Sequence, residues 1–89
     1  MSNESLTNEI ERMRNERNAS ICRDWEREAP AAVRGGAAPS RVLAVLASRY
    51  DMTAQGVENV LRIAGLYDGA RKYKESVIAA DAAAKTERP

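Results

Sequence analysis

The sequence predicts an all-α fold, and three observations carry that prediction. Alanine, arginine and glutamate, which favour helices, are abundant, whereas runs of β-branched residues are scarce. The only aromatic residues are Trp25, Tyr50, Tyr67 and Tyr73, so aliphatic side chains and alanine must build most of the core. Apolar residues also recur at helical spacing. The 89 residues make one small domain, and a chain of this size buries only about 60% of its unfolded surface.

The helical spacing is clearest between Pro39 and Leu66. Two groups of residues each fall at i, i+3, i+4 and i+7: Leu43, Leu46, Ala47 and Tyr50, then Val57, Val60, Leu61 and Ala64. Only Asp51-Met52-Thr53 connects the two helices, so they must cross, with the small Ala47 at the contact. This is the design of a helix-turn-helix, in which the second helix enters the DNA major groove.

The ends of these two helices have local signals. The first begins at Pro39-Ser40, with either Ser40 as the cap or Pro39 in the first turn. Asp51 falls at the turn, where a positive φ is often needed. Thr53 is expected to cap the next helix through its hydroxyl, and Gly65 to stop it. We therefore predict a recognition helix over residues 53–64.

The segment before this motif predicts a long helix from Leu6 to Glu28. Its apolar stripe consists of Leu6, Ile10, Met13, Ile21 and Trp25. Arg17 interrupts the stripe, which favours a division into an N-terminal arm (1–16) and a helix-turn-helix domain (17–67). Trp25 is expected to fill the space between this helix and the motif.

Two connections and a last helix complete the prediction. Pro30 is expected to end the first helix, leaving residues 29–38 as a loop that is either mobile or a contact surface. A turn at 67–69 precedes a helix over 70–84, and residues 85–89 form a frayed tail. This C-terminal part comprises residues 68–89.

The outward face of the predicted recognition helix carries side chains that suit base edges. The candidates for base contacts are Ala54, Gln55, Glu58, Asn59 and Arg62. Candidates for contacts with the DNA backbone are Arg41, Arg49, Thr53, Arg71 and Lys72. A simpler interpretation is that these residues form the polar face of an amphipathic helix, with Glu58 and Arg62 as an i,i+4 pair.

The central segment resembles a known class of proteins. Leu46-Ala47, Tyr50-Asp51-Met52-Thr53, Val57 and Val60-Leu61 are similar to the helix-turn-helix core of small prokaryotic and phage regulators. The upstream residues Arg17-Asn18, Ile21 and Trp25 resemble the lead helix of Mor-type phage activators and resolvase-type DNA-binding domains. The resemblance implies a sequence-specific transcriptional regulator that binds double-stranded DNA. Asp51 departs from it, because a glycine is usual at that position of the turn.

Other functional classes find little support in the residues. The chain has no histidine, Cys22 is its only cysteine, and Gly35-Gly36 lacks the residues of a phosphate-binding loop, so we expect no enzyme, cofactor or metal site. Cys22 is interpreted as a half-buried structural thiol. The first residues, Met1 to Glu4, lack the basic start and apolar run of a secretory signal, and no apolar stretch approaches the roughly 18 residues of a membrane span, so we expect a cytoplasmic protein. Its net charge is only +1, with a modest basic bias over residues 29–67.

Two apolar stripes predict a homodimer, because a small core cannot cover them. The candidate interface residues are Leu6, Ile10 and Met13 on the arm, and Tyr73, Val77 and Ile78 on the last helix. A two-fold pair would separate the recognition helices by about 34 Å, one turn of DNA. Two alternatives stay open: the stripes fold back on the monomer's own core, or the chain is a helical adaptor or inhibitor that binds a host protein without binding DNA.

Overall fold

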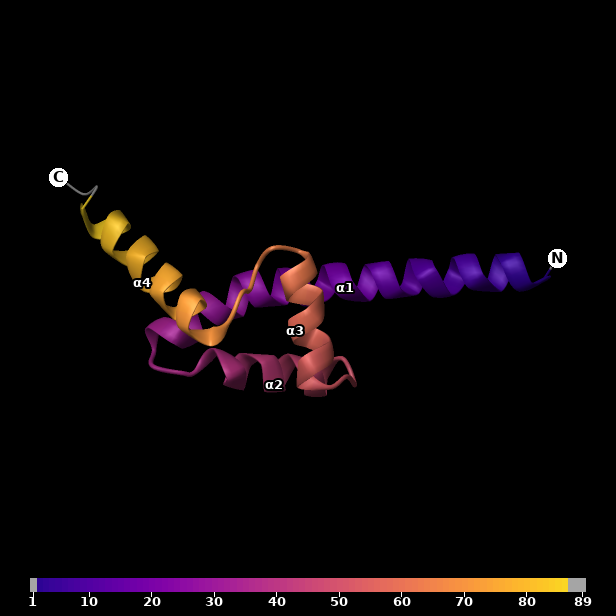
Figure 1. Cartoon of the computed structure of the whole chain (residues 1–89), viewed down its shortest axis with the longest axis horizontal. Helices are drawn as coiled ribbons and strands as arrows, with labels where there is room; N and C mark the ends of the chain where they lie inside the picture. The colour runs from indigo at the N-terminus through magenta and orange to yellow at the C-terminus, as the bar shows by residue number, and fades with distance from the viewer. Residues whose placement is uncertain (1, 87–89) are drawn as a thin grey trace.

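Between residues 2 and 86 the protein forms four helices. Figure 1 shows their arrangement in the computed structural model. The structure describes the backbone of residues 2–86 and the side chains of residues 5–83. The helices are α1 (Ser2–Arg34), α2 (Pro39–Arg49), α3 (Ala54–Ile63) and α4 (Ala70–Thr86). No strand occurs between residues 2 and 86. The prediction of an all-α fold is confirmed.

Helix α1 is longer than the sequence predicted, because it continues through Pro30 to Arg34. The prediction that Pro30 ends the helix is wrong, and so is the predicted loop over 29–38, since only residues 35–38 connect α1 to α2. Proline removes one helical hydrogen bond, but ending the helix there would expose Ala29 and Val33, which are 0% and 5% exposed. Gly36 ends the helix instead, at φ 98°.

The start of α2, the turn after it and the start of α3 form at the residues that the sequence predicted. Pro39 occupies the first turn of α2, and Ala38 is its N-cap without a side-chain hydrogen bond. Asp51 has φ 54°, and the next amide, that of Met52, donates to the carbonyl of Ala47 at 2.8 Å. The Thr53 hydroxyl accepts from the amide of Gly56 at 3.0 Å, which confirms it as the cap of α3.

The end of α3 also matches the prediction. Gly65 has φ 77°, its amide donates to the carbonyl of Arg62 at 3.0 Å, and the amide of Leu66 donates to that of Leu61 at 2.9 Å. This pair of hydrogen bonds closes the helix around a glycine. Helix α4 extends two residues further than expected, so Lys85 and Thr86 are helical rather than part of a tail; 87–89 lie outside the described residues.

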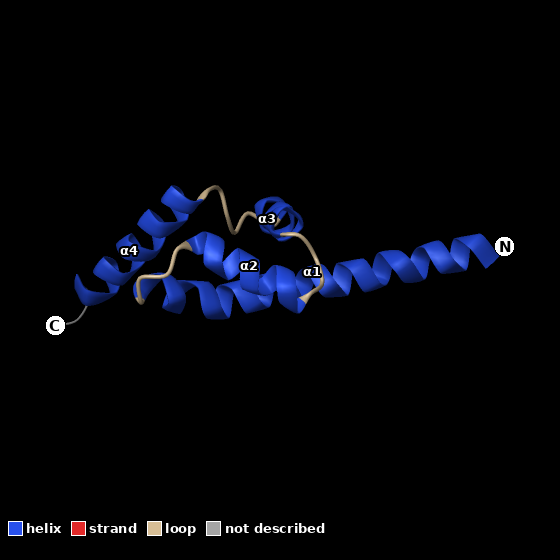
Figure 2. Ribbon diagram, turned by 90° about the horizontal axis from the view of Figure 1, so that it is seen from below, coloured by secondary structure: helices blue, strands red, loops and turns tan. Residues whose placement is uncertain are grey.

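The core lies where α3 crosses α1 and α2. Figure 1 shows α3 running steeply across both helices, and Figure 2, turned by 90°, shows α3 nearly end-on beside them. The largest fully buried side chains are Trp25, Ile21, Leu46, Leu61 and Val57. The Trp25 ring lies 5.4 Å from the Tyr67 ring and 4.8 Å from the Tyr73 ring, between centroids. Trp25 is buried, as predicted, in the core that α1 shares with α2 and α3, and its ring contacts are with the segment before α4 and with α4 itself.

The N-terminal part of α1 projects beyond this core (Figure 1). Every side chain from 5 to 16 is exposed, and Arg17 is the first one along α1 that is partly buried. The helix backbone is continuous across this change. The projection makes the molecule elongated, with principal extents of 62 × 25 × 18 Å.

Candidate functional site

Helix α3 has one buried face and one polar outer face. Val57 and Leu61 are 0% exposed, whereas Gln55, Asn59 and Arg62 are exposed on the outer side. The Gln55 amide nitrogen donates to the Asn59 amide oxygen at 3.1 Å. Of the other two predicted base-contacting residues, Ala54 is exposed at the start of the helix and Glu58 is half-buried. The predicted set therefore lies together on one helix, with its polar members largely accessible.

Arg62 is held by one carboxylate on α3 and by another in the connection that follows it. Its guanidinium donates to Glu58 at 2.9 Å and to Asp68 at 3.2 Å, and it lies 5.7 Å from the centre of the Tyr67 ring. The hydrogen bond to Glu58 raises the pKa of Arg62 above its ordinary value. The i,i+4 pair considered from the sequence does form, so the outer face of α3 is close to neutral.

The residues predicted to contact the DNA backbone differ in whether their side chains already form contacts within the protein. Arg41 is exposed near the start of α2 and forms no ion pair within the described part of the chain. Lys72 pairs with Asp68 at 3.0 Å, and Arg71 approaches Glu75 at 3.8 Å. The Thr53 side chain is used by the α3 cap. Of these cations, Arg41 is therefore the one whose charge is most available to a phosphate.

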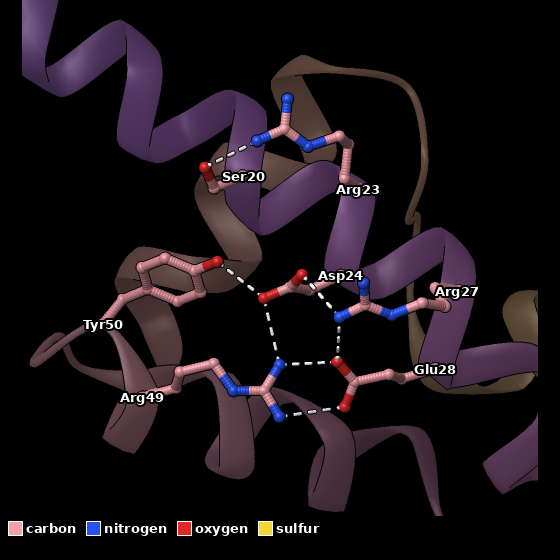
Figure 3. Close-up of polar contacts among 7 residues, drawn as sticks. All are labelled: Ser20, Arg23, Asp24, Arg27, Glu28, Arg49 and Tyr50. Carbon is pink, nitrogen blue, oxygen red and sulfur yellow. Dashed lines mark hydrogen bonds and ion pairs between the residues drawn. The ribbon is translucent and has the colours of Figure 1, made fainter.

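Arg49 has a role inside the fold that sequence reasoning missed. Figure 3 shows its guanidinium between Asp24 and Glu28 of α1, where it donates to Asp24 at 3.0 Å and forms two hydrogen bonds with Glu28. The Tyr50 hydroxyl donates to Asp24 at 2.6 Å, and Arg27 bridges the two carboxylates from the same helix. These contacts fasten the end of α2, and with it the turn before α3, to α1.

The charges of this cluster perturb its acids and bases in consistent directions. Hydrogen bonds from Tyr50 and then Arg49 lower the pKa of Asp24, while hydrogen bonds from Arg49 and then Arg27 lower the pKa of Glu28. The same bonds raise the pKa of Arg49, and donation to Asp24 raises the pKa of Tyr50. Each group is thus held in the protonation state that keeps the contact.

We expect these contacts to make stability fall in acid. Because Asp24 and Glu28 have lowered pKa values in the folded state, the unfolded chain takes up protons first. Their contribution is complete above about pH 5 and is lost as the pH falls through the folded pKa values. Thermal unfolding followed by circular dichroism from about pH 7 to pH 2 measures this loss. Arg49→Gln should flatten the curve, and an unchanged acid dependence in that variant would contradict the prediction.

The residues predicted to form a dimer fall into two groups. Val77 is 7% exposed and Tyr73 is half-buried against Trp25, so these two are used within the monomer. The alternative that the stripe folds back on its own core therefore holds for this part of α4. Ile78 is 59% exposed. The arm residues Leu6, Ile10 and Met13 have no cover in the described chain.

An apolar feature beside α3 was also missed. Ile63 is 88% exposed and borders a shallow groove between α1 and α3 of about 250 Å³, whose other apolar lining is Ala19, Cys22, Val60 and Ala64. Cys22 is half-buried there, and burial raises the pKa of its thiol, which suits the structural role expected of it. Ile63 falls outside the i, i+3, i+4 stripe of its helix, and that mismatch was the available signal.

Between residues 2 and 86, no helix combines the length and the apolar character needed to cross a membrane. No group of three or more potential metal ligands occurs among residues 5–83, whose side chains the structure describes. Comparison with protein-family models, curated proteins and solved structures finds no match to this chain.

Proposed function

We propose that this protein is a sequence-specific DNA-binding transcriptional regulator of bacterial or phage type, which places α3 in the major groove. The observation that carries the proposal is the arrangement of α2, the Asp51 turn and α3. Val57 and Leu61 fix α3 on the core, and Gln55, Asn59 and Arg62 are left on the side that faces away from it. A helix that reads the major groove needs both: one face packed firmly on the core and an opposite polar face that DNA can reach.

The chemistry of the outer face fits base edges. The amides of Gln55 and Asn59 match the donor and acceptor pair that adenine presents, and the Arg62 guanidinium matches guanine. The bonds that hold them in the free protein, Gln55 to Asn59 and Arg62 to Glu58 and Asp68, are all solvent-exposed, so bases can replace them at small cost. Arg41 is available for a phosphate.

We expect Asn59→Ala and Arg62→Ala each to weaken specific binding by roughly five- to a hundredfold. Both side chains are exposed, so the unfolding temperature should change little. The affinities are measured by titrating each protein into a labelled DNA fragment that was selected for binding. The fluorescence anisotropy of the DNA is followed over a series of salt concentrations. Binding should also fall steeply with salt if phosphates are contacted.

Arg23→Ala is the matched control, because Arg23 is an exposed arginine on α1 whose side chain contacts Ser20 at 3.0 Å. It should bind as the unaltered protein does. Full affinity in both α3 variants would remove the basis for groove reading by this helix.

A second function is favoured by one observation, the exposed Ile63 beside the apolar groove. An apolar side chain this exposed next to a groove suits contact with another protein, as in an adaptor or inhibitor that binds a host protein. The same titration separates the two functions. The adaptor function predicts no fragment-specific binding at low salt, together with a protein complex that Ile63→Asp weakens.

A further inference from the structure

The face of α1 that carries the exposed arm residues is the same face that receives α2. Leu6, Ile10 and Met13 are 57%, 47% and 60% exposed. At 100° per residue their positions coincide in direction with those of Asp24 and Glu28, whose carboxylates hold Arg49 of α2. One continuous face of α1 is therefore covered by α2 in its C-terminal half and bare in its N-terminal half.

We propose that the occupant of the bare half is the arm of a second copy of this chain, running antiparallel about a two-fold axis near Ile10. Leu6, Ile10 and Met13 of each copy then cover those of the other. In this arrangement each arm continues the line of its partner's α2, so that both halves of the α1 face are filled.

The position of α2 determines the direction of the second arm. In a parallel pair both α1 helices would continue side by side past residue 17, and each would meet the other's α2 on the shared face (Figure 1). In an antiparallel pair the core domains lie at opposite ends and the collision does not arise. The arm, residues 1–16, carries both signs of charge with a net side-chain charge of −2, from Glu4, Glu9, Glu11 and Glu16 against Arg12 and Arg14, and salt screens the repulsion between two exposed arms.

The antiparallel arrangement also sets the distance between the two α3 helices. Helix α3 crosses α1 near Asn18 and Cys22, which line the groove between them, about ten residues from Ile10. At 1.5 Å per residue this is about 15 Å from the axis, so the two α3 helices lie about 30 Å apart along α1. In one copy α3 lies on one side of the α1–α2 layer (Figures 1 and 2), and a two-fold axis perpendicular to that layer would keep both α3 helices on the same side. The spacing approximates one turn of DNA, about 34 Å, and this part of the inference rests on the proposed function.

Sedimentation measures whether the pair forms. Three apolar side chains per copy make an interface below the usual size, so the full chain should be in monomer–dimer exchange at micromolar concentration or above. Ile10→Asp should weaken the dimer at least about tenfold. The control is Ile78→Asp, a similarly exposed isoleucine on α4, which should leave it unchanged. A monomer up to millimolar concentration, or loss of the dimer only in the Ile78 variant, would overturn the inference.

Cysteine cross-linking then tests the direction. In a Cys22→Ser background, Ile10→Cys lies at the axis and should form a disulfide between copies when oxidised with copper–phenanthroline. Leu6→Cys and Met13→Cys should each cross-link poorly alone but efficiently when mixed, because an antiparallel pair brings position 6 near position 13. Strong cross-linking of each variant alone indicates a parallel pair and contradicts the proposal.

These measurements use no DNA, so their failure is separate from failure of the proposed function. If the antiparallel dimer forms but binds no DNA, the interface stands and the groove-reading proposal falls. If the chain binds a single DNA site but stays monomeric, the groove-reading proposal stands and the antiparallel interface falls. Should both hold, binding sites arranged as inverted repeats about one turn apart should bind cooperatively, and Ile10→Asp should remove the cooperativity.

Discussion

Trp25→Ala is expected to cost about 3–5 kcal/mol of folding free energy. The indole is 1% exposed and contacts Tyr67 and Tyr73, so its removal leaves a cavity where α1 meets the segment before α4 and α4 itself. Native proteins have a total stability of about 5–15 kcal/mol, so a substantial part of the stability would be lost. Urea unfolding, followed by helical circular dichroism, measures the change.

Trp25→Phe separates packing from hydrogen bonding. The indole nitrogen is buried and has no hydrogen-bond partner within the described chain, so phenylalanine forfeits no polar contact and keeps an aromatic ring between the tyrosines. Its cost should be well below that of alanine. If both variants were as stable as the unaltered protein, Trp25 would not be the contact that joins α1 to the other helices.

Ala47→Leu is expected to destabilise the protein by about 1–3 kcal/mol. Ala47 is 7% exposed in the core where α2 meets α3, and its carbonyl accepts the Met52 amide that closes the turn at 2.8 Å. A larger side chain must push the helices apart or strain this turn. Equilibrium unfolding measures the stability, and DNA titration of the same variant tests whether α3 is displaced.

Ala44→Leu provides the matched control for this position. Ala44 is on the same helix but exposed, so a leucine there adds no volume to the core and should change stability by less than about 0.5 kcal/mol. Equal effects at the two positions would mean that the contact between α2 and α3 does not depend on a small residue.

The sequence determined the features that depend on nearby residues alone. A helix cap joins groups three to five positions apart, so Thr53 and Gly65 could be identified as the ends of α3 without knowing the fold. Asp51 at a positive φ was predictable for the same reason. The two faces of α3 also followed from spacing, because a helix turns by a constant angle per residue. The candidate residues could therefore be proposed as a set before any tertiary contact was known.

Only the tertiary structure decided which of several local possibilities each segment uses. Pro30 weakens a helix, yet burial of Ala29 and Val33 continues α1 past it, because packing of apolar surface outweighs one missing hydrogen bond. Arg49 looked like any exposed cation until α1, 21 to 25 residues away in sequence, brought two carboxylates to it. Tyr73 and the arm stripe had similar apolar patterns, and only the path of the chain placed one on Trp25 and left the other exposed. Spacing within a helix shows which side chains share a face, whereas what covers that face depends on contacts between segments far apart in the chain.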